Sequence, residues 1–167
     1  MGYNKYSPIS DGRRLKMDSH AKAKLTQYNK SFKSIDETYR NAAKRFGMSE
    51  CTFWILYTLR VEKPPVTQSE ICALQYQPKQ TVNSALKKLE SEGFLTLSVG
   101  ADRRNKYVSL TEKGLALAEK TVDIFAESEA NALLMMSEDE QDTLCRLLKK
   151  YNSLLNSKLQ VPDLKGD

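Results

Sequence analysis

The hydrophobic pattern changes its period near Gly93, and this change constrains the fold more than any other feature of the chain. Before Gly93, the apolar residues of "VNSALKKL" (82–89) recur at spacings of three and four, which predicts a helix with one buried stripe. After it, "FLTLSV" (94–99) and "KYVSL" (106–110) alternate with period two and predict two strands. We therefore expect an amphipathic helix followed by a β-hairpin with a charged tip, "GADRRN" (100–105).

The outward side of this helix is polar and basic, with no acidic residue at its centre, whereas an ordinary solvated helix, the alternative interpretation, usually mixes both charge signs. Amide side chains both donate and accept hydrogen bonds, which suits base edges in the major groove, and lysines neutralise phosphates. We expect Gln80, Ser84 and Lys87 in the groove. Asn83 and Lys88 are expected to face the DNA backbone. The predicted DNA-binding residues of this helix are Lys79, Gln80, Thr81, Asn83, Ser84, Lys87 and Lys88.

A shorter helix is predicted just before this one. "TQSEICAL" (67–74) has Thr67 and Glu70 in capping-box spacing, and Pro78 suits the first position of the helix that follows. Short helix, turn, amphipathic helix and hairpin in this order form a winged helix-turn-helix, so the predicted fold class is mainly α with a small β-hairpin wing. The exposed start of the short helix is expected to offer hydroxyl and backbone N–H groups to a phosphate, from Thr67, Gln68 and Ser69.

Long helices are predicted on both sides of this lobe. Apolar residues recur at spacings of four and three over 19–46, a heptad stripe that Gly47 ends, and "SEDE" (137–140) is a capping box that opens a last helix. A single helix is also predicted from Thr111 through Met136. Because so long a stripe exceeds what a small domain covers, we predict a homodimer, although packing within one chain stays open. The predicted dimer contacts are Leu25, Tyr28, Phe32, Leu147, Tyr151, Leu154 and Leu155.

The segment "ESEGFLTLSVGADRRNKYVSLTEKG" (90–114) resembles the wing of the multiple-antibiotic-resistance-regulator (MarR) family of bacterial transcription factors. The shared elements are the Glu-Gly before the first strand, the Asp-x-Arg at 102–104 and the "SLTEKG" that leads into the next helix. The resemblance implies that Arg104 enters the minor groove while Asp102 holds it in place; a surface ion pair is the alternative. The wing residues expected at the DNA are Asp102, Arg103, Arg104, Asn105 and Lys106.

The resemblance, which extends over residues 20–157, also implies partners. It implies a homodimer that binds a pseudo-palindromic double-stranded DNA operator and usually blocks transcription. Some relatives of this family sense phenolic or other anionic small molecules and others use a reactive cysteine near the start of the first helix, so a small-molecule effector stays open here, without predicted binding residues. The alternative is a winged helix used for protein contact, which should expose apolar residues on its recognition helix.

Composition narrows the class of protein further. Residues 1–47 hold 11 Lys+Arg against 4 Asp+Glu, whereas residues 111–167 hold 7 against 11, and the basic front fits a nucleic-acid partner. One histidine, scattered cysteines and the lack of a phosphate-binding loop predict no enzyme, no metal and no cofactor. Cys51, Cys72 and Cys145 are expected in the core. No apolar run is long enough for a membrane span or a secretory signal, so a cytoplasmic location is expected.

The expected organisation is an N-terminal arm, an N-terminal dimerisation helix, the DNA-binding lobe, C-terminal helices that complete the dimerisation region, and a tail. Their expected bounds are 1–18, 19–47, 48–110, 111–160 and 161–167. In the arm, Arg13, Arg14 and Lys16 either contact DNA or are simply solvated; the sequence leaves both open.

Overall fold

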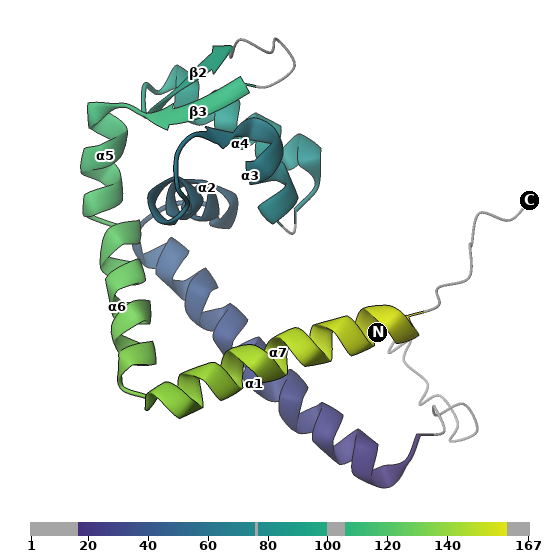
Figure 1. Ribbon diagram of the computed structural model, residues 1–167. Coiled ribbons are helices and arrows are strands. Elements are labelled where there is room, and N and C mark those ends of the chain that lie inside the picture. Colours follow the sequence, from purple (N-terminus) through teal and green to yellow (C-terminus); the bar gives the residue numbers. More distant parts are fainter. Residues whose placement is uncertain (1–16, 76, 100–105, 160–167) are drawn as a thin grey trace, which may run out of the picture. The chain divides into compact units, whose positions relative to one another are not determined.

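The computed structural model describes residues 17–75, 77–99 and 106–159, and the chain divides into two compact units, 1–45 and 46–167 (Figure 1). Helices dominate both units, and a small antiparallel sheet belongs to the second. Among the described residues, no helix combines the length and the apolar character that a membrane crossing requires.

The first unit contains α1 (Ser19–Arg45), the long helix that the heptad stripe predicts. Asp18 caps its N-terminus, since the Ala21 N–H donates to Asp18 Oδ1 at 2.9 Å. The apolar stripe of α1 lies largely at the surface: the side chains of Phe32 and Ile35 are 60% and 56% exposed. The helix is therefore confirmed, and its stripe remains open to solvent.

The second unit is built around α2 (Glu50–Val61), in which Phe53 and Ile55 are fully buried. Ser49 caps the start of this helix, because its hydroxyl accepts the Thr52 N–H at 3.1 Å. The cap defines where the helix starts. Its buried apolar residues fit a helix that other elements cover on several sides.

One of these covering elements is α6 (Val122–Leu134). The Arg60 guanidinium at the end of α2 donates three hydrogen bonds to the Asp123 carboxylate, between 2.6 and 3.1 Å long. The rings of Phe53 and Phe125 pack edge to face with centroids 5.3 Å apart. A bidentate ion pair and an aromatic contact therefore hold α6 on α2.

The helix-turn-helix consists of α3 (Gln68–Leu74) and α4 (Lys79–Ser91). The predicted capping box is confirmed: the Thr67 N–H donates to Glu70 Oε2 at 2.7 Å, and the Glu70 N–H donates to Thr67 Oγ1 at 3.1 Å. Pro78 lies one residue before its predicted position, because its ψ of 132° is extended and helical geometry begins at the next residue.

The inner side of α4 is buried as predicted. Val82 and Leu86 are fully covered, Leu89 is nearly so, and Ala85 is half-buried. These residues join one core cluster that draws on α2, α3 and the sheet. Other buried members of this cluster are Cys51, Ile55, Val66, Ile71, Leu95 and Val108.

The predicted hairpin is confirmed, with β2 (Leu95–Val99) and β3 (Lys106–Leu110) antiparallel. A two-residue strand, β1 (Val66–Thr67), pairs with the other edge of β3, so the strand order is β1-β3-β2. Val108 of β3 consequently lies opposite a residue of each neighbouring strand. The sequence did not predict β1, because two residues are too few to show a period.

The segment "SLTEKG" (109–114) is fastened to the chain that leaves α4. The Thr111 hydroxyl donates to the Gly93 carbonyl at 2.7 Å, and Lys113 Nζ donates to the Glu92 carbonyl at 2.7 Å. Gly93 itself has a φ of +74°, which ends α4 without the strain that a side chain would add. The two ends of the hairpin are therefore tied together at its base.

Gly114 allows α5 (Glu112–Glu119) to lie directly against the start of the hairpin. A Cβ atom at Gly114 would stand 1.9 Å from the carbonyl oxygen of Phe94. No side chain fits this approach, so a glycine inside a helix is explained here by packing rather than by backbone freedom.

One predicted element is wrong: the single helix expected from Thr111 through Met136 is divided into α5 and α6. The break falls at Thr121, whose φ of −135° and ψ of −87° leave helical geometry. Its hydroxyl donates to the Leu117 carbonyl at 2.7 Å, and threonines that bond back to the preceding turn bend helices. The apolar periodicity continues across this point, so it did not predict the break between the two helices.

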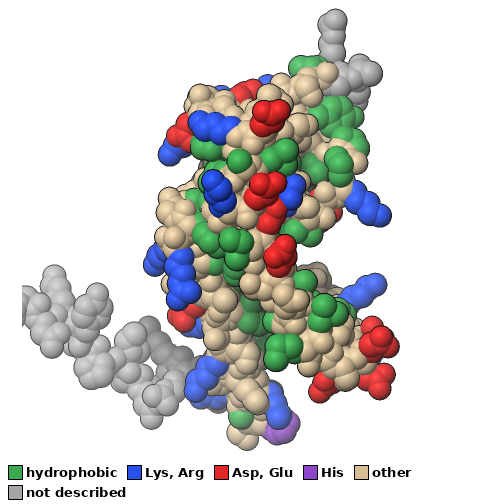
Figure 2. Space-filling model, turned by 90° about the vertical axis from the view of Figure 1, so that its left-hand side faces the viewer, with side chains coloured by type: hydrophobic (Ala, Val, Ile, Leu, Met, Phe, Trp, Pro, Cys, Tyr) green, Lys and Arg blue, Asp and Glu red, His purple; other side chains and the backbone are tan. Residues whose placement is uncertain are grey.

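The last helix, α7 (Glu138–Lys158), begins with the predicted capping box. The Ser137 N–H donates to Glu140 Oε2 at 2.9 Å, and the Glu140 N–H donates to Ser137 Oγ at 3.4 Å. None of the described residues of α7 is buried; Leu147 and Leu154 are each about half exposed. Hydrophobic side chains are accordingly visible at the surface among charged ones in Figure 2.

We predict that Gly114→Ala destabilises the protein. The added methyl must displace the Phe94 carbonyl, and we expect a net loss of at least about 2 kcal/mol in the free energy of unfolding, although alanine alone would favour the helix by ~1 kcal/mol. Urea unfolding followed by circular dichroism measures this loss. The control is Ala116→Gly at an exposed position of α5, which should cost only ~1 kcal/mol; a Gly114→Ala variant as stable as wild type would contradict the close packing.

Candidate nucleic-acid interface

The outward side of α4 carries amides, hydroxyls and lysines at the surface. Gln80, Ser84 and Lys87 are exposed, as their helical spacing predicts, and Lys79, Thr81 and Lys88 are exposed as well. The Lys88 ammonium lies 3.8 Å from the Glu92 carboxylate, with 74% of its side chain exposed, so solvent weakens this pair. The exposure of these residues is a fact of the fold; their contact with DNA stays a prediction.

The hydroxyls of α4 have a defined hydrogen-bonding direction. Ser84 Oγ donates its hydrogen to the Gln80 carbonyl at 2.9 Å, and Ser91 Oγ donates to the Lys88 carbonyl at 2.8 Å. With that hydrogen committed, the lone pairs of Ser84 Oγ point outward as acceptors. Ser84 therefore suits an amino group on a base edge better than a phosphate oxygen.

At the start of α3, where phosphate contacts are predicted, the Thr67 side chain is engaged within the helix cap. The Thr67 hydroxyl accepts the Glu70 N–H and donates to Glu70 Oε2 at 2.8 Å, so it is committed to the cap. The Glu70 carboxylate accepts hydrogen bonds from the Thr67 backbone N–H and from the Thr67 hydroxyl, and these two bonds lower its pKa, which keeps this exposed carboxylate ionised. A phosphate approaching Ser69, which is exposed, would therefore meet a negative charge.

Gln68 and Asn83 contact each other across the two helices. Gln68 Nε2 donates to Asn83 Oδ1 at 2.8 Å, and the Cys72 thiol donates to the same oxygen at 3.5 Å. All three side chains are half-buried. Sequence analysis missed this network, because nothing in the local pattern predicts the angle at which α3 crosses α4.

The wing is described only in its strands. Lys106, the first residue of β3, is exposed and lies opposite Val99. The other predicted wing residues, Asp102, Arg103, Arg104 and Asn105, lie outside the described residues, as do Arg13, Arg14 and Lys16 of the arm.

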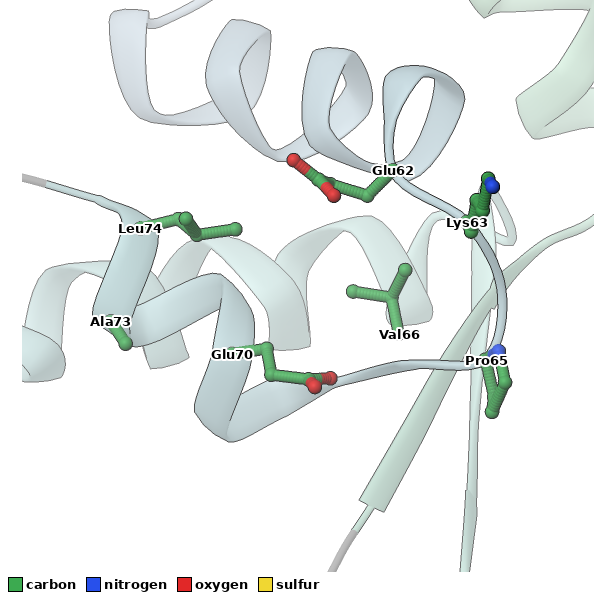
Figure 3. A pocket seen from close by; sticks show the side chains of 7 residues that line it. All are labelled: Glu62, Lys63, Pro65, Val66, Glu70, Ala73 and Leu74. Carbon is green, nitrogen blue, oxygen red and sulfur yellow. The ribbon is translucent and has the colours of Figure 1, made fainter.

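A pocket of about 240 Å³ opens between the end of α2 and α3 (Figure 3). The carboxylates of Glu62 and Glu70 project beside it, with the single cation of Lys63 at its rim. Pro65 and Leu74 contribute apolar surface. Two acids against one base make this pocket unsuited to phosphate or nucleic acid.

A second hollow, of about 400 Å³, lies behind α4. Three hydroxyls line it, from Ser49, Thr52 and Ser84, together with the Lys88 ammonium and the Glu92 carboxylate, which lie 3.8 Å apart. Its apolar lining is formed by Phe46, Met48, Ala85, Leu89, Phe94 and Leu117. A pocket with this lining suits a small molecule that has an apolar body and a hydroxyl group, because the one cation is offset by a carboxylate.

The cysteines occupy three different environments. Cys51 is buried, as predicted, and burial raises the pKa of its thiol. Cys72 is half-buried against the core, and burial raises its pKa too. Cys145 is exposed on α7, so its prediction as a core residue is wrong for the single chain. Within the described part of the chain, no three His, Cys, Asp or Glu side chains gather as a metal site would require.

The seven residues predicted for a dimer are exposed, on α1 and on α7. They are Leu25, Tyr28, Phe32, Leu147, Tyr151, Leu154 and Leu155. Apolar stripes of this length at the surface of one chain are typical of surfaces that another chain covers.

Comparison with known proteins identifies the fold's relatives. A sequence profile described as MarR family matches residues 46–105. The chain is 33% identical to the HTH-type transcriptional regulator YkoM of Bacillus subtilis over 74% of this chain and 80% of that protein. It is 31% identical to the HTH-type transcriptional regulator PecS of Dickeya dadantii over 72% of this chain and 75% of PecS.

Solved structures agree with this relationship. NMB1585, a MarR family regulator from Neisseria meningitidis, is 25% identical and superposes with a TM-score of 0.71 over 81% of this chain and 96% of that one. MepR of S. aureus in its complex with DNA is 27% identical, with a TM-score of 0.59 over 77% of this chain and 97% of MepR. These relatives are regulators rather than enzymes, and their winged-helix fold is the predicted one. The chain therefore belongs to the MarR family of helix-turn-helix transcriptional regulators.

Proposed function

We propose that this regulator is a sequence-specific repressor, which binds a pseudo-palindromic operator in double-stranded DNA as a homodimer. The observation that carries the proposal is the outward side of α4, where amide, hydroxyl and ammonium groups are exposed above a fully buried stripe. Such a helix fits the major groove and offers groups that bond to base edges. A helix used for protein contact should expose apolar residues there instead.

Two kinds of contact are expected on α4. Gln80 can donate and accept together, and Ser84 presents lone pairs, so both suit direct reading of bases. Lys79, Lys87 and Lys88 supply charge that neutralises phosphates whatever the sequence. We therefore assign specificity to the polar groups and most of the salt-dependent affinity to the lysines.

The wing is expected to contact the DNA in a second groove. By the resemblance to the family wing we assign Arg104 to the minor groove and Asp102 to its support, and we expect Arg103 and Lys106 to contact phosphates. A narrow minor groove has an enhanced negative potential that attracts a guanidinium, so this assignment has a physical basis independent of base contacts.

The exposed stripes of α1 and α7 support the homodimer. A two-fold dimer places two copies of α4 roughly 34 Å apart, one turn of DNA, which matches half-sites related by the same symmetry. The dimer would also cover apolar side chains that a lone chain leaves at the surface.

The hollow behind α4 supports the release of DNA by a small molecule. Its hydroxyls and aromatic lining suit a phenolic compound, whereas the Lys88 ammonium there is offset by the Glu92 carboxylate. Because Ser84 and Lys88 line the hollow and belong to α4, a ligand that binds there alters the helix that would read the DNA.

Selection of bound sequences from a random duplex pool tests the proposal. We expect enrichment of an inverted repeat with half-sites about one helical turn apart, and a lower yield when a phenolic acid is added. In a reporter cell, a promoter that carries the selected repeat should be less active when the chain is expressed. A pool that stays random would exclude sequence-specific binding, and single half-sites would exclude the dimer.

We predict that Gln80→Ala weakens operator binding more than non-specific binding. Loss of a bidentate contact between the amide and a base should lower operator affinity roughly 5- to 100-fold, with little change in affinity for a scrambled duplex. Fluorescence anisotropy on both duplexes measures the ratio, and Gln27→Ala on α1 is a control for removal of an exposed glutamine. Equal losses on both duplexes would mean that Gln80 reads no base.

We predict that Arg104→Ala lowers operator affinity about tenfold and leaves the dimer intact. The guanidinium acts in the minor groove, far in sequence from the proposed dimer contacts, so sedimentation should be unchanged. A gel-shift titration gives the affinity, and Lys120→Ala, an exposed position that loses the same charge, is the control. Unchanged affinity would remove Arg104 from the interface.

A further inference from the structure

The oxygen of the Asn83 side chain accepts two hydrogen bonds, one from Gln68 Nε2 at 2.8 Å and one from the Cys72 thiol at 3.5 Å. Both donors belong to α3, whereas Asn83 belongs to α4. Two convergent donors define which end of the amide is oxygen, so the Asn83 carboxamide has one preferred orientation.

The thiol is suited to this task. Burial raises the pKa of Cys72, so the sulfur keeps its hydrogen at neutral pH and donates it. A thiolate would instead repel the Asn83 oxygen. Cys72 therefore supports the network as a hydrogen-bond donor.

Apolar packing determines which side of α4 is buried, whereas the fine placement of α4 against α3 also depends on directional contacts. Ile71 of α3 and Val82 and Leu86 of α4 share the core, but dispersion and hydrophobic contacts are non-directional and tolerate small shifts. A hydrogen bond weakens steeply when its length or angle changes. The network is the directional contact between these two helices among the described residues.

We propose that Asn83 is a positioning residue: with Gln68 and Cys72 it sets the orientation of α4, and so determines which bases the exposed residues of α4 meet. The inference rests on the proposed function. It replaces the expectation that Asn83 faces the DNA backbone and that Gln68 binds a phosphate. Asn83 lies between Gln80 and Ser84 along α4, so a small rotation at Asn83 moves both of these side chains in the groove.

A double-mutant cycle tests the proposal. Asn83→Ala and Gln68→Ala should each lower operator affinity roughly 3- to 30-fold, and the double variant should lose no more than Asn83→Ala alone, because that change already removes the bond from Gln68. Affinity for a scrambled duplex and the salt dependence of binding should stay unchanged. Additive losses, or a smaller salt dependence in either variant, would show direct DNA contact and overturn the inference.

The thiol provides a matched pair of variants. Cys72→Ser retains a donor and should keep the operator-to-scrambled affinity ratio within about twofold, whereas Cys72→Ala should lower it in the same way as Asn83→Ala. Cys145→Ala, at the exposed cysteine of α7, is the control and should change nothing. A Cys72→Ala variant with the wild-type ratio would remove the thiol from the network.

Hydrogen exchange without DNA separates this inference from the proposed function. In Asn83→Ala the amides of α3 and α4 should exchange faster while those of α6 do not, which also shows that the variant is folded. Unaltered exchange in α3 and α4 would overturn the positioning role. If the wild-type chain selects no operator at all, the proposed function fails instead, and the exchange measurement still decides how the helices are held.

Discussion

The burial of the inner stripe of α4 is the contact on which the other features of the lobe depend. Val82, Leu86 and Leu89 each remove an aliphatic side chain from water, worth roughly 1.5–3 kcal/mol apiece, against at most about 1 kcal/mol for an exposed ion pair such as Lys88–Glu92. Rotation of α4 about its axis would give up this burial. The polar residues on the other side of the helix therefore face outward. Because of the helical period, burial of one side determines which residues are exposed on the other.

A few contacts also hold the hairpin in place. The hairpin begins after Gly93 and ends before Thr111. The Thr111 hydroxyl donates a hydrogen bond of 2.7 Å to the Gly93 carbonyl, which joins these two ends. Lys113 reaches back to the Glu92 carbonyl and also lies 4.3 Å above the centre of the Phe94 ring. The base of the hairpin is thus anchored next to the end of α4, so the two elements that are proposed to enter neighbouring grooves share one rigid attachment.

Local signals predicted the fold well, and contacts between distant residues account for what they missed. The capping boxes at Thr67 and Ser137 and the two strands after Gly93 are encoded within a few residues, and the structure has them. The break at Thr121 depends on a hydroxyl that competes with the helix, which periodicity does not detect. In the candidate site, the exposed side of α4 followed from the pattern, whereas the bond from Gln68 to Asn83 depends on how two helices cross. The DNA contacts themselves stay predictions.

Affinity and specificity place different demands on this lobe, and the residues of α4 divide accordingly. Charge acts over a Debye length of about 10 Å and tolerates small displacements, so exposed lysines need no exact placement. Hydrogen bonds to base edges need alignment within a few tenths of an ångström, and they inherit every shift of the helix that carries them. An aliphatic residue at position 83 would pack against α3 without the cost of covering a polar group. A half-buried asparagine with two donors on its oxygen contributes less stability but constrains the orientation of α4. A helix that reads bases requires such a defined orientation.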